Sequence, residues 1–131
     1  MNKQILVVDD NAPIRRLVRI AIESRPGLAV CGEAVDGVDA LEKGGLLKPD
    51  LIVMDLLMPR MNGLEAAVAL RRIVPQAPII MFTFHQDAIS GHQVNEAGIS
   101  SVFSKTNRLS ALLDEIERLT NGTAAHGCSS A

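Results

Sequence analysis

The chain has 131 residues, of which 47% are hydrophobic and 21% are charged, so it is long enough for one globular domain but hardly for two. Its 13 Lys and Arg residues against 15 Asp and Glu residues give a formal net charge of −2, which provides no general attraction to nucleic acid or anionic lipid. With 3 Phe, no Tyr or Trp and only 2 Cys, the composition disfavours a single-strand nucleic-acid binder, a disulfide scaffold and a zinc ribbon, and it leaves open an α/β domain.

Five short apolar runs predict the strands of a parallel sheet. The runs are rich in β-branched residues and lack polar alternation, which is typical of strands that are covered on both faces. The fifth run is the weakest, because Ser100 and Ser101 interrupt it. In chain order the runs are Ile5–Val8, Leu28–Cys31, Leu51–Met54, Ile79–Phe82 and Ile99–Phe103.

The intervals between the runs predict helices, because their apolar residues recur at spacings of three and four. Pro13 suits the first turn of the first helix, Asp36 opens the second, and Pro75 ends the third. The segment Gln86–Ala97 contains poor helix formers such as Ser90, and it is assigned as a helix mainly because a crossover is needed there. The periodic stripes of the other four helices lie at Ile14–Ile22, Val38–Leu46, Leu64–Arg71 and Leu109–Leu119.

The alternation of strands and helices with short connections predicts parallel βαβ units with right-handed crossovers. Asn121-Gly122 is expected to stop the last helix, so we predict one domain over residues 1–120 and a disordered polar tail over residues 121–131. The N-terminus has no secretory signal, and no apolar run approaches the roughly 18 residues that cross a bilayer. We therefore expect a cytoplasmic protein that does not enter membranes.

Polar and charged residues follow four of the five runs, where the predicted strands end. Asp9 and Asp10 follow the first run, Asp55 follows the third, Thr83 follows the fourth, and Lys105 comes two residues after the fifth. Because ligands bind outside the carboxyl ends of the strands in open α/β sheets, we expect these side chains to meet at one edge. A single polar residue of this kind usually marks only the point where the chain leaves the sheet for solvent, but the five together predict a site.

Three of these side chains are carboxylates, which repel one another, and a compact fold tolerates them only with a cation or with shifted pKa values. Oxygen ligation by few carboxylates suits Mg²⁺. An aspartate can act as a nucleophile toward phosphorus, while a lysine neutralises phosphoryl charge and a threonine donates a hydrogen bond to a phosphoryl oxygen. The set therefore predicts phosphoryl transfer to a carboxylate, where positioning and charge stabilisation do most of the catalysis.

The stretch that follows the third run reads Asp55-Leu56-Leu57-Met58-Pro59-Arg60-Met61-Asn62-Gly63. Together with Val7-Val8-Asp9-Asp10, Thr83 and Lys105, it resembles the receiver domain of bacterial two-component response regulators, over about Lys3 to Thr120. The resemblance implies a chemotaxis-receiver-like, flavodoxin-like α/β fold. Its sheet is doubly wound and parallel, with five strands in the order 2-1-3-4-5 and helices on both faces.

The resemblance also implies a role for each site residue. Asp55 is expected to be the phosphoacceptor, Thr83 the hydroxyl that moves toward the phosphoryl group, and Lys105 the cation that pairs with it. The residues expected to hold Mg²⁺ are Asp10 and Asp55 directly, Asp9 through a water, and Leu57 through its backbone carbonyl.

The expected partners follow from the same resemblance. A sensor histidine kinase or phosphotransfer protein would donate the phosphoryl group, and a downstream protein would receive the output. Thr106, which follows the lysine where many receivers have proline, is typical of receivers that precede helix-turn-helix output domains. Since nothing after Thr120 encodes such a domain, we expect no direct nucleic-acid binding, and a homodimer is left open. The basic cluster Arg15, Arg16 and Arg19 is either a solvated helix face or a docking surface for an acidic patch.

Three residues depart from the family pattern. Val102 stands where receivers carry a switching Tyr or Phe, so we expect that lever to be absent and Phe103 to lie in the core unless a bulge turns it. Phe84 stands where a small residue is usual; its ring either restricts the site or lies back over the surface. His85 either tunes hydrolysis or is simply solvated.

Two alternative functions remain. A pseudo-receiver would bind its partner without phosphorylation, but the complete acidic cluster argues against it. A Mg²⁺-dependent phosphohydrolase with an aspartate nucleophile usually has a second aspartate two residues later, where this chain has Leu57. We therefore expect no enzyme activity beyond the chain's own phosphorylation and dephosphorylation.

Overall fold

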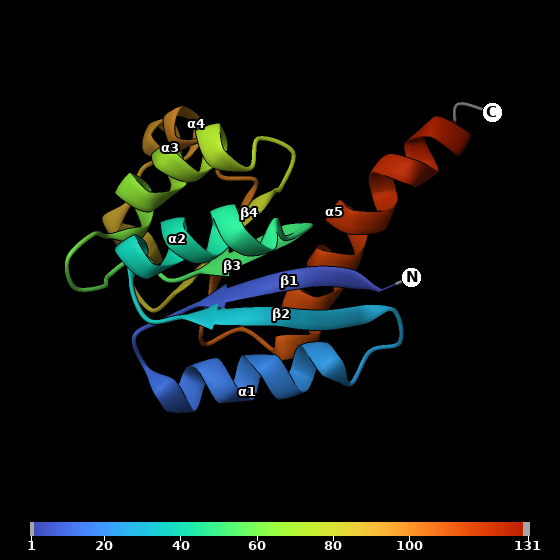
Figure 1. Cartoon of the computed structure of the whole chain (residues 1–131), viewed down its shortest axis with the longest axis horizontal. Helices are drawn as coiled ribbons and strands as arrows, with labels where there is room; N and C mark the ends of the chain where they lie inside the picture. The colour runs from blue at the N-terminus through green and yellow to red at the C-terminus, as the bar shows by residue number, and fades with distance from the viewer. Residues whose placement is uncertain (1, 130–131) are drawn as a thin grey trace.

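The computed structural model describes the backbone of residues 2–129 and the side chains of residues 2–121. Its strands form one parallel sheet in the order β2-β1-β3-β4-β5, and helices cover both faces (Figure 1), so the predicted fold class and strand order are confirmed. The strands are β1 (Lys3–Val8), β2 (Leu28–Ala34), β3 (Leu51–Met54), β4 (Ile79–Thr83) and β5 (Ser101–Ser104). All five predicted strands are present, with ends that differ by a few residues.

The segment between β4 and β5 differs from the single helix predicted over Gln86–Ala97. It forms a short 3₁₀ turn, η1 (Gln86–Ala88), before the helix begins. The break has a local cause: Ser90 caps the helix through a reciprocal pair of hydrogen bonds with Gln93, which fixes the helix start after Ser90. The helices are α1 (Ala12–Glu23), α2 (Gly37–Leu47), α3 (Gly63–Ile73), α4 (Gly91–Ala97) and α5 (Leu109–Ser129).

The backbone of α5 continues through Asn121-Gly122, where the sequence predicts a stop, so that predicted helix end is wrong. The disorder of residues 121–131 and the domain boundary at residue 120 stay predictions. Residues 130 and 131 lie outside the described residues. Within the described part of the chain, no helix is both long and apolar enough to span a bilayer.

The sheet separates two hydrophobic clusters, because side chains alternate between its faces. Ile5 and Val7 of β1 pack toward α1 and α5 with Val18 and Ile22. The alternate residues Leu6 and Val8 pack toward α2, α3 and α4. With helices on both faces, the central strands β1, β3 and β4 are almost completely buried at their carboxyl ends. The loops that leave these ends are therefore anchored in the core.

Capped helices fix the loops at the carboxyl edge of the sheet. Asn11 caps α1 by accepting a hydrogen bond from Ile14 N at 3.0 Å, and Asp36 caps α2 through Asp39 N at 2.8 Å, as the sequence predicts for Asp36. The side chain of Asn62 caps α3 with a full capping box. Each cap stabilises a helix start directly beside the site.

The buried face of α2 differs from the predicted stripe. Val38 is 38% exposed and Leu46 is 76% exposed, while the buried positions are the small residues Gly37, Ala40 and Gly44. The cause is close packing against α3, since a Cβ at Gly44 would lie 2.7 Å from the side chain of Leu70. Small residues therefore take the fully buried positions here, Leu41 of the predicted stripe packs partly buried against the same core, and Val38 and Leu46 face outward.

Candidate functional site

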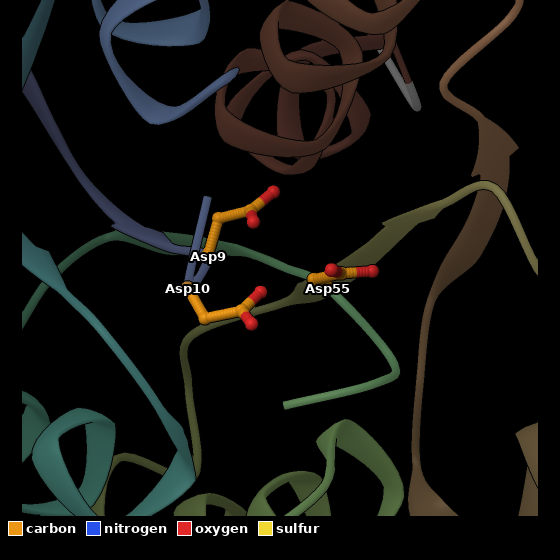
Figure 2. A group of neighbouring side chains, drawn as sticks. All are labelled: Asp9, Asp10 and Asp55. Atoms are coloured by element: carbon orange, nitrogen blue, oxygen red, sulfur yellow. The ribbon is translucent and has the colours of Figure 1, made fainter. Parts of the chain in front are cut away.

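Three carboxylates meet where the central strands β1 and β3 end. Asp9 and Asp10 follow β1, and Asp55 follows β3, which pairs directly with β1. The backbone N–H of Asp55 donates to the Val8 carbonyl at 3.0 Å, so the two strand ends are held in register. Each of the three carboxylates offers an oxygen, and these oxygens lie within 4.8 Å of one another. Figure 2 shows the three side chains near one another. The predicted convergence of the three acids is therefore observed.

Lys105 supplies the positive charge of this cluster. Its Nζ lies 2.7 Å from Oδ2 of Asp9 and 3.1 Å from Oδ2 of Asp55, and its side chain is only 4% exposed. The backbone N–H of Lys105 donates to the Thr83 carbonyl at 2.9 Å, which continues the β4–β5 ladder and directs the lysine into the site. One ammonium thus bridges two carboxylates that would otherwise repel each other.

Asp55 and Thr83 occupy neighbouring strand ends with different hydrogen bonds. Oδ1 of Asp55 accepts from Leu56 N at 2.8 Å, and the residue is buried. Thr83 is fully buried, and its Oγ1 accepts from His85 N at 3.0 Å. That bond uses the Thr83 oxygen as acceptor, so the hydroxyl hydrogen remains available for donation. No hydrogen bond joins Thr83 to Asp55 in the part of the chain that the structure describes.

The electrostatics of the cluster reflect burial on one side and solvent on the other. Burial raises the pKa of Asp9, although hydrogen bonds from Lys105 and from the Asn11 N–H, the latter at 2.9 Å, oppose that shift. Asp10 is exposed, so the cluster is open to a cation from solvent at that side chain. Oxygen donors on a partly open edge fit a hard divalent cation such as Mg²⁺.

An ion-pair network behind the cluster was not predicted. Arg15 donates from Nη1 to the Asp9 carbonyl and from Nε to Glu33, both at 2.7 Å, and Arg19 donates to the other Glu33 oxygen at 2.7 Å. Two of the three arginines of the basic cluster are thus paired, whereas Arg16 is exposed. The sequence signals for this network are the basic cluster itself and the charged Glu33 within an otherwise apolar strand.

Replacing Glu33 with glutamine should lower the free energy of unfolding by about 1 kcal/mol at neutral pH, since Arg19 is half exposed and screened by solvent. Its arginine partners lower the pKa of Glu33 below the usual 4.5, so this stabilisation is present above pH 4.5 and is lost as the pH falls through the lowered pKa. Urea denaturation at several pH values measures the difference. Glu23→Gln, which affects a 3.5 Å exposed pair with the same Arg19, is the control and should have almost no effect. A difference for Glu33→Gln that persists at low pH would contradict the electrostatic cause.

A second unpredicted pair braces the loop after Asp55. Arg60 adopts a left-handed backbone conformation with φ of 66°, and its side chain forms two hydrogen bonds to Asp36, at 2.7 and 3.1 Å. These bonds lower the pKa of Asp36, and they join the loop to the start of α2. The bidentate pair holds a backbone conformation that is uncommon for a residue other than glycine.

The three departures from the family pattern have definite positions. The β4–β5 pairing contains no bulge, so Val102 lies opposite Met81 and Phe103 lies opposite Phe82. Phe103 is half-buried and packs against the cluster under α1 and α5, as predicted, and the alternative bulge is wrong. Val102 packs on the other face, without an aromatic ring.

The two residues that follow β4, Phe84 and His85, are both exposed. Phe84 is 56% exposed, and the Nζ of Lys105 lies 5.3 Å from the centre of its ring. The ring thus lies beside the Lys105 ammonium while more than half of the residue stays exposed, and a restriction of the site by this ring stays a prediction. His85 is exposed, and its backbone rather than its ring contacts Thr83.

Comparisons with known proteins agree on one family. A sequence model described as "Response regulator receiver domain" matches residues 5–117. The response regulator protein VraR of Staphylococcus epidermidis is 32% identical over 119 residues, which cover 91% of this chain and 57% of that protein. The Staphylococcus aureus VraR is 31% identical over 122 residues, covering 93% of this chain and 58% of that protein. The chain thus spans somewhat more than half the length of these curated relatives.

Solved structures give the same answer. A two-component response regulator of the LuxR family from Aurantimonas sp. SI85-9A1 is 35% identical with a TM-score of 0.86, covering 93% of this chain and 87% of that one. The response regulator domain of Thermotoga maritima CheB is 30% identical with a TM-score of 0.84, covering 92% and 98%. Both similarities extend over nearly the whole chain described above.

Proposed function

The chain belongs to the response regulator receiver family, and on that premise we propose that Asp55 accepts a phosphoryl group in a two-component phosphorelay. The donor is a sensor histidine kinase or a phosphotransfer protein. The observation that carries this proposal is the position of Asp55, a buried carboxylate at the end of a central strand, between two further acids and the ammonium of Lys105. This is the charge arrangement that an aspartyl phosphate needs.

In the proposed reaction, a carboxylate oxygen of Asp55 attacks the phosphorus of a phosphohistidine. A bond between that oxygen and phosphorus forms while the phosphorus–nitrogen bond breaks, and the nitrogen keeps the electron pair and takes up a proton. The aspartyl phosphate adds negative charge to a site that already holds two other carboxylates. Lys105 offsets this charge, and the free hydrogen of the Thr83 hydroxyl turns toward a phosphoryl oxygen.

A divalent cation fits the acidic cluster. We assign Mg²⁺ to the carboxylates of Asp10 and Asp55, to Asp9 through a water, and to the backbone carbonyl of Leu57. Support comes from the clustering of the three carboxylates and from the exposure of Asp10. Bound there, Mg²⁺ supplies charge stabilisation between the carboxylate and the phosphoryl group.

The output of the switch is a changed surface for a downstream protein partner in the cytoplasm. The chain acts as a signalling domain that supports only its own phosphorylation and dephosphorylation, without turnover of other substrates. Support comes from Leu57, since a phosphohydrolase of this type usually has an acid at that position, and this residue is apolar and half exposed. Direct binding to nucleic acid or membranes is not part of the proposal.

Mass spectrometry after incubation with a small phosphodonor and Mg²⁺ tests the proposal. Wild type should gain the mass of one phosphoryl group, and Asp55→Asn should gain none, because the amide cannot act as the nucleophile. Asp114→Asn is the control, since its exposed carboxylate on α5 lies outside the cluster, and it should behave as wild type. A gain that persists in Asp55→Asn would refute Asp55 as the acceptor. No gain in wild type would favour the pseudo-receiver, and steady phosphate release from esters would favour the phosphohydrolase.

A further inference from the structure

We propose that Phe84 is a positioning residue, whose ring holds the Lys105 ammonium against Asp9 and Asp55 for phosphoryl transfer. Three groups surround this ammonium: the two carboxylates at 2.7 and 3.1 Å, and the Phe84 ring with its centre at 5.3 Å. A cation within about 6 Å of a ring centre is attracted by the negative face of the ring. The proposal deepens the function proposed above and rests on it wherever phosphorylation is the readout.

The burial of Lys105 supports this role. The lysine side chain is only 4% exposed, although Phe84, its neighbour on the outer side, is 56% exposed. An exposed phenylalanine contributes little to the core, so its ring serves here as a cover over the charge. A covered ammonium keeps fewer waters, and its pull on a developing negative charge is correspondingly stronger.

The backbone explains how the ring reaches the lysine. Phe84 follows the last residue of β4, and Lys105 follows the last residue of β5, which pairs with β4. Thr83 and Ser104 lie opposite each other in this ladder, and the Lys105 N–H donates to the Thr83 carbonyl. The two residues therefore leave neighbouring strand ends side by side, and the His85 N–H bond to Thr83 Oγ1 fixes the turn that carries the ring.

The first test measures access to Lys105 and does not depend on phosphorylation. The protein is treated with a limiting amine-acylating reagent, and peptide mass spectrometry gives the modification of Lys105 relative to the exposed Lys48 in the same sample. The Lys105 ratio should rise roughly three- to tenfold in Phe84→Ala, the range of an exposed to partly desolvated cation–π contact. Phe84→Tyr keeps the ring face and should stay near wild type. An unchanged ratio in Phe84→Ala would overturn the proposal.

The second test separates the ring face from simple bulk. The rate constant for phosphorylation by a small phosphodonor should fall roughly three- to tenfold in Phe84→Ala and Phe84→Leu, and it should stay near the wild-type value in Phe84→Tyr. Leu46→Ala, which removes an exposed apolar side chain on α2, is the control for surface truncation and should match wild type. Equal rate constants in Phe84→Leu and Phe84→Tyr would overturn attraction by the ring face.

The two readouts also separate failure of this inference from failure of the proposed function. If wild type takes up no phosphoryl group, the proposed function fails, and the acylation ratio still decides whether Phe84 holds Lys105. If the acylation ratio rises in Phe84→Ala but the phosphorylation rate does not fall, Phe84 covers the lysine without positioning it for the reaction, which overturns the inference.

Discussion

Replacing Lys105 with methionine should lower the free energy of unfolding by about 3 kcal/mol at neutral pH. Methionine keeps most of the aliphatic stem but removes the charge that lies 2.7 Å from Asp9 and 3.1 Å from Asp55. Both carboxylates are at least nine-tenths buried, so they would face each other without a cation. Urea denaturation in a chelating buffer measures the loss. Lys48→Met, at an exposed lysine with no ion pair among the described residues, is the control and should change little.

The pH dependence of this effect identifies its cause. Loss of the ammonium should raise the pKa of Asp9 further above its usual 3.8, beyond the rise that burial already causes. A carboxyl group whose pKa is raised in the folded state costs no stability below its usual pKa, where it is protonated in both the folded and unfolded states. It destabilises the fold as the pH increases through the raised pKa. The difference between Lys105→Met and wild type should therefore shrink toward pH 4, and added Mg²⁺ should recover part of it at neutral pH. A loss that is independent of both pH and Mg²⁺ would indicate lost packing instead.

Replacing Gly63 with alanine should cost about 3 kcal/mol of stability, at the upper end of what overpacking costs, and should slow phosphorylation of Asp55. Gly63 is the first residue of α3, and its N–H donates to the Leu56 carbonyl at 2.7 Å. A Cβ there would overlap the backbone oxygen of Asp55 and would lie 3.0 Å from the Cα of Leu56. Because these atoms are backbone, the loop that carries Asp55 must move to make room.

Gly45→Ala is the matched control for Gly63→Ala. Gly45 lies within α2, and a Cβ there would meet only a methyl group of Ile73 at 3.6 Å, an ordinary contact. Alanine is the better helix former, so this variant should gain about 0.5–1 kcal/mol. Parallel urea titrations and phosphorylation time courses compare the two variants. Wild-type stability and kinetics in Gly63→Ala would show that the predicted backbone overlap is relieved without consequence.

The fold and the members of the site were predictable because both depend on short-range rules. A parallel strand that is covered on both faces needs a continuous apolar run, and the carboxyl ends of parallel strands share one edge. Asp9, Asp55, Thr83 and Lys105 could thus be assigned to one edge from their places after such runs. The capping residue Asp36 was predictable for a similar reason, since its side chain acts on the backbone three residues away.

The remaining features depend on contacts that no local pattern encodes. Arg15 meets Glu33, and Arg60 meets Asp36, only after the chain has folded, and many other pairs of opposite charge were equally compatible with the sequence. The helix start after Ser90 is different, because the spacing of Ser90 and Gln93 is a local capping-box pattern that the assignment of one helix over Gln86–Ala97 overlooked. Phe84 stood out as a departure, but the direction of its ring depends on the turn that His85 fixes.

The reach of Lys105 has a thermodynamic consequence. This residue follows the edge strand β5, yet its ammonium contacts Asp9 beside β1, so one side chain ties the sheet's edge to its centre. A partner that bound at the β5 edge and moved Lys105 would change the affinity of the site for a phosphoryl group. By linkage, phosphorylation would change the affinity for that partner by the same factor. Such coupling would be reciprocal at equilibrium: a partner that binds the phosphorylated form more tightly would favour phosphorylation by the same factor.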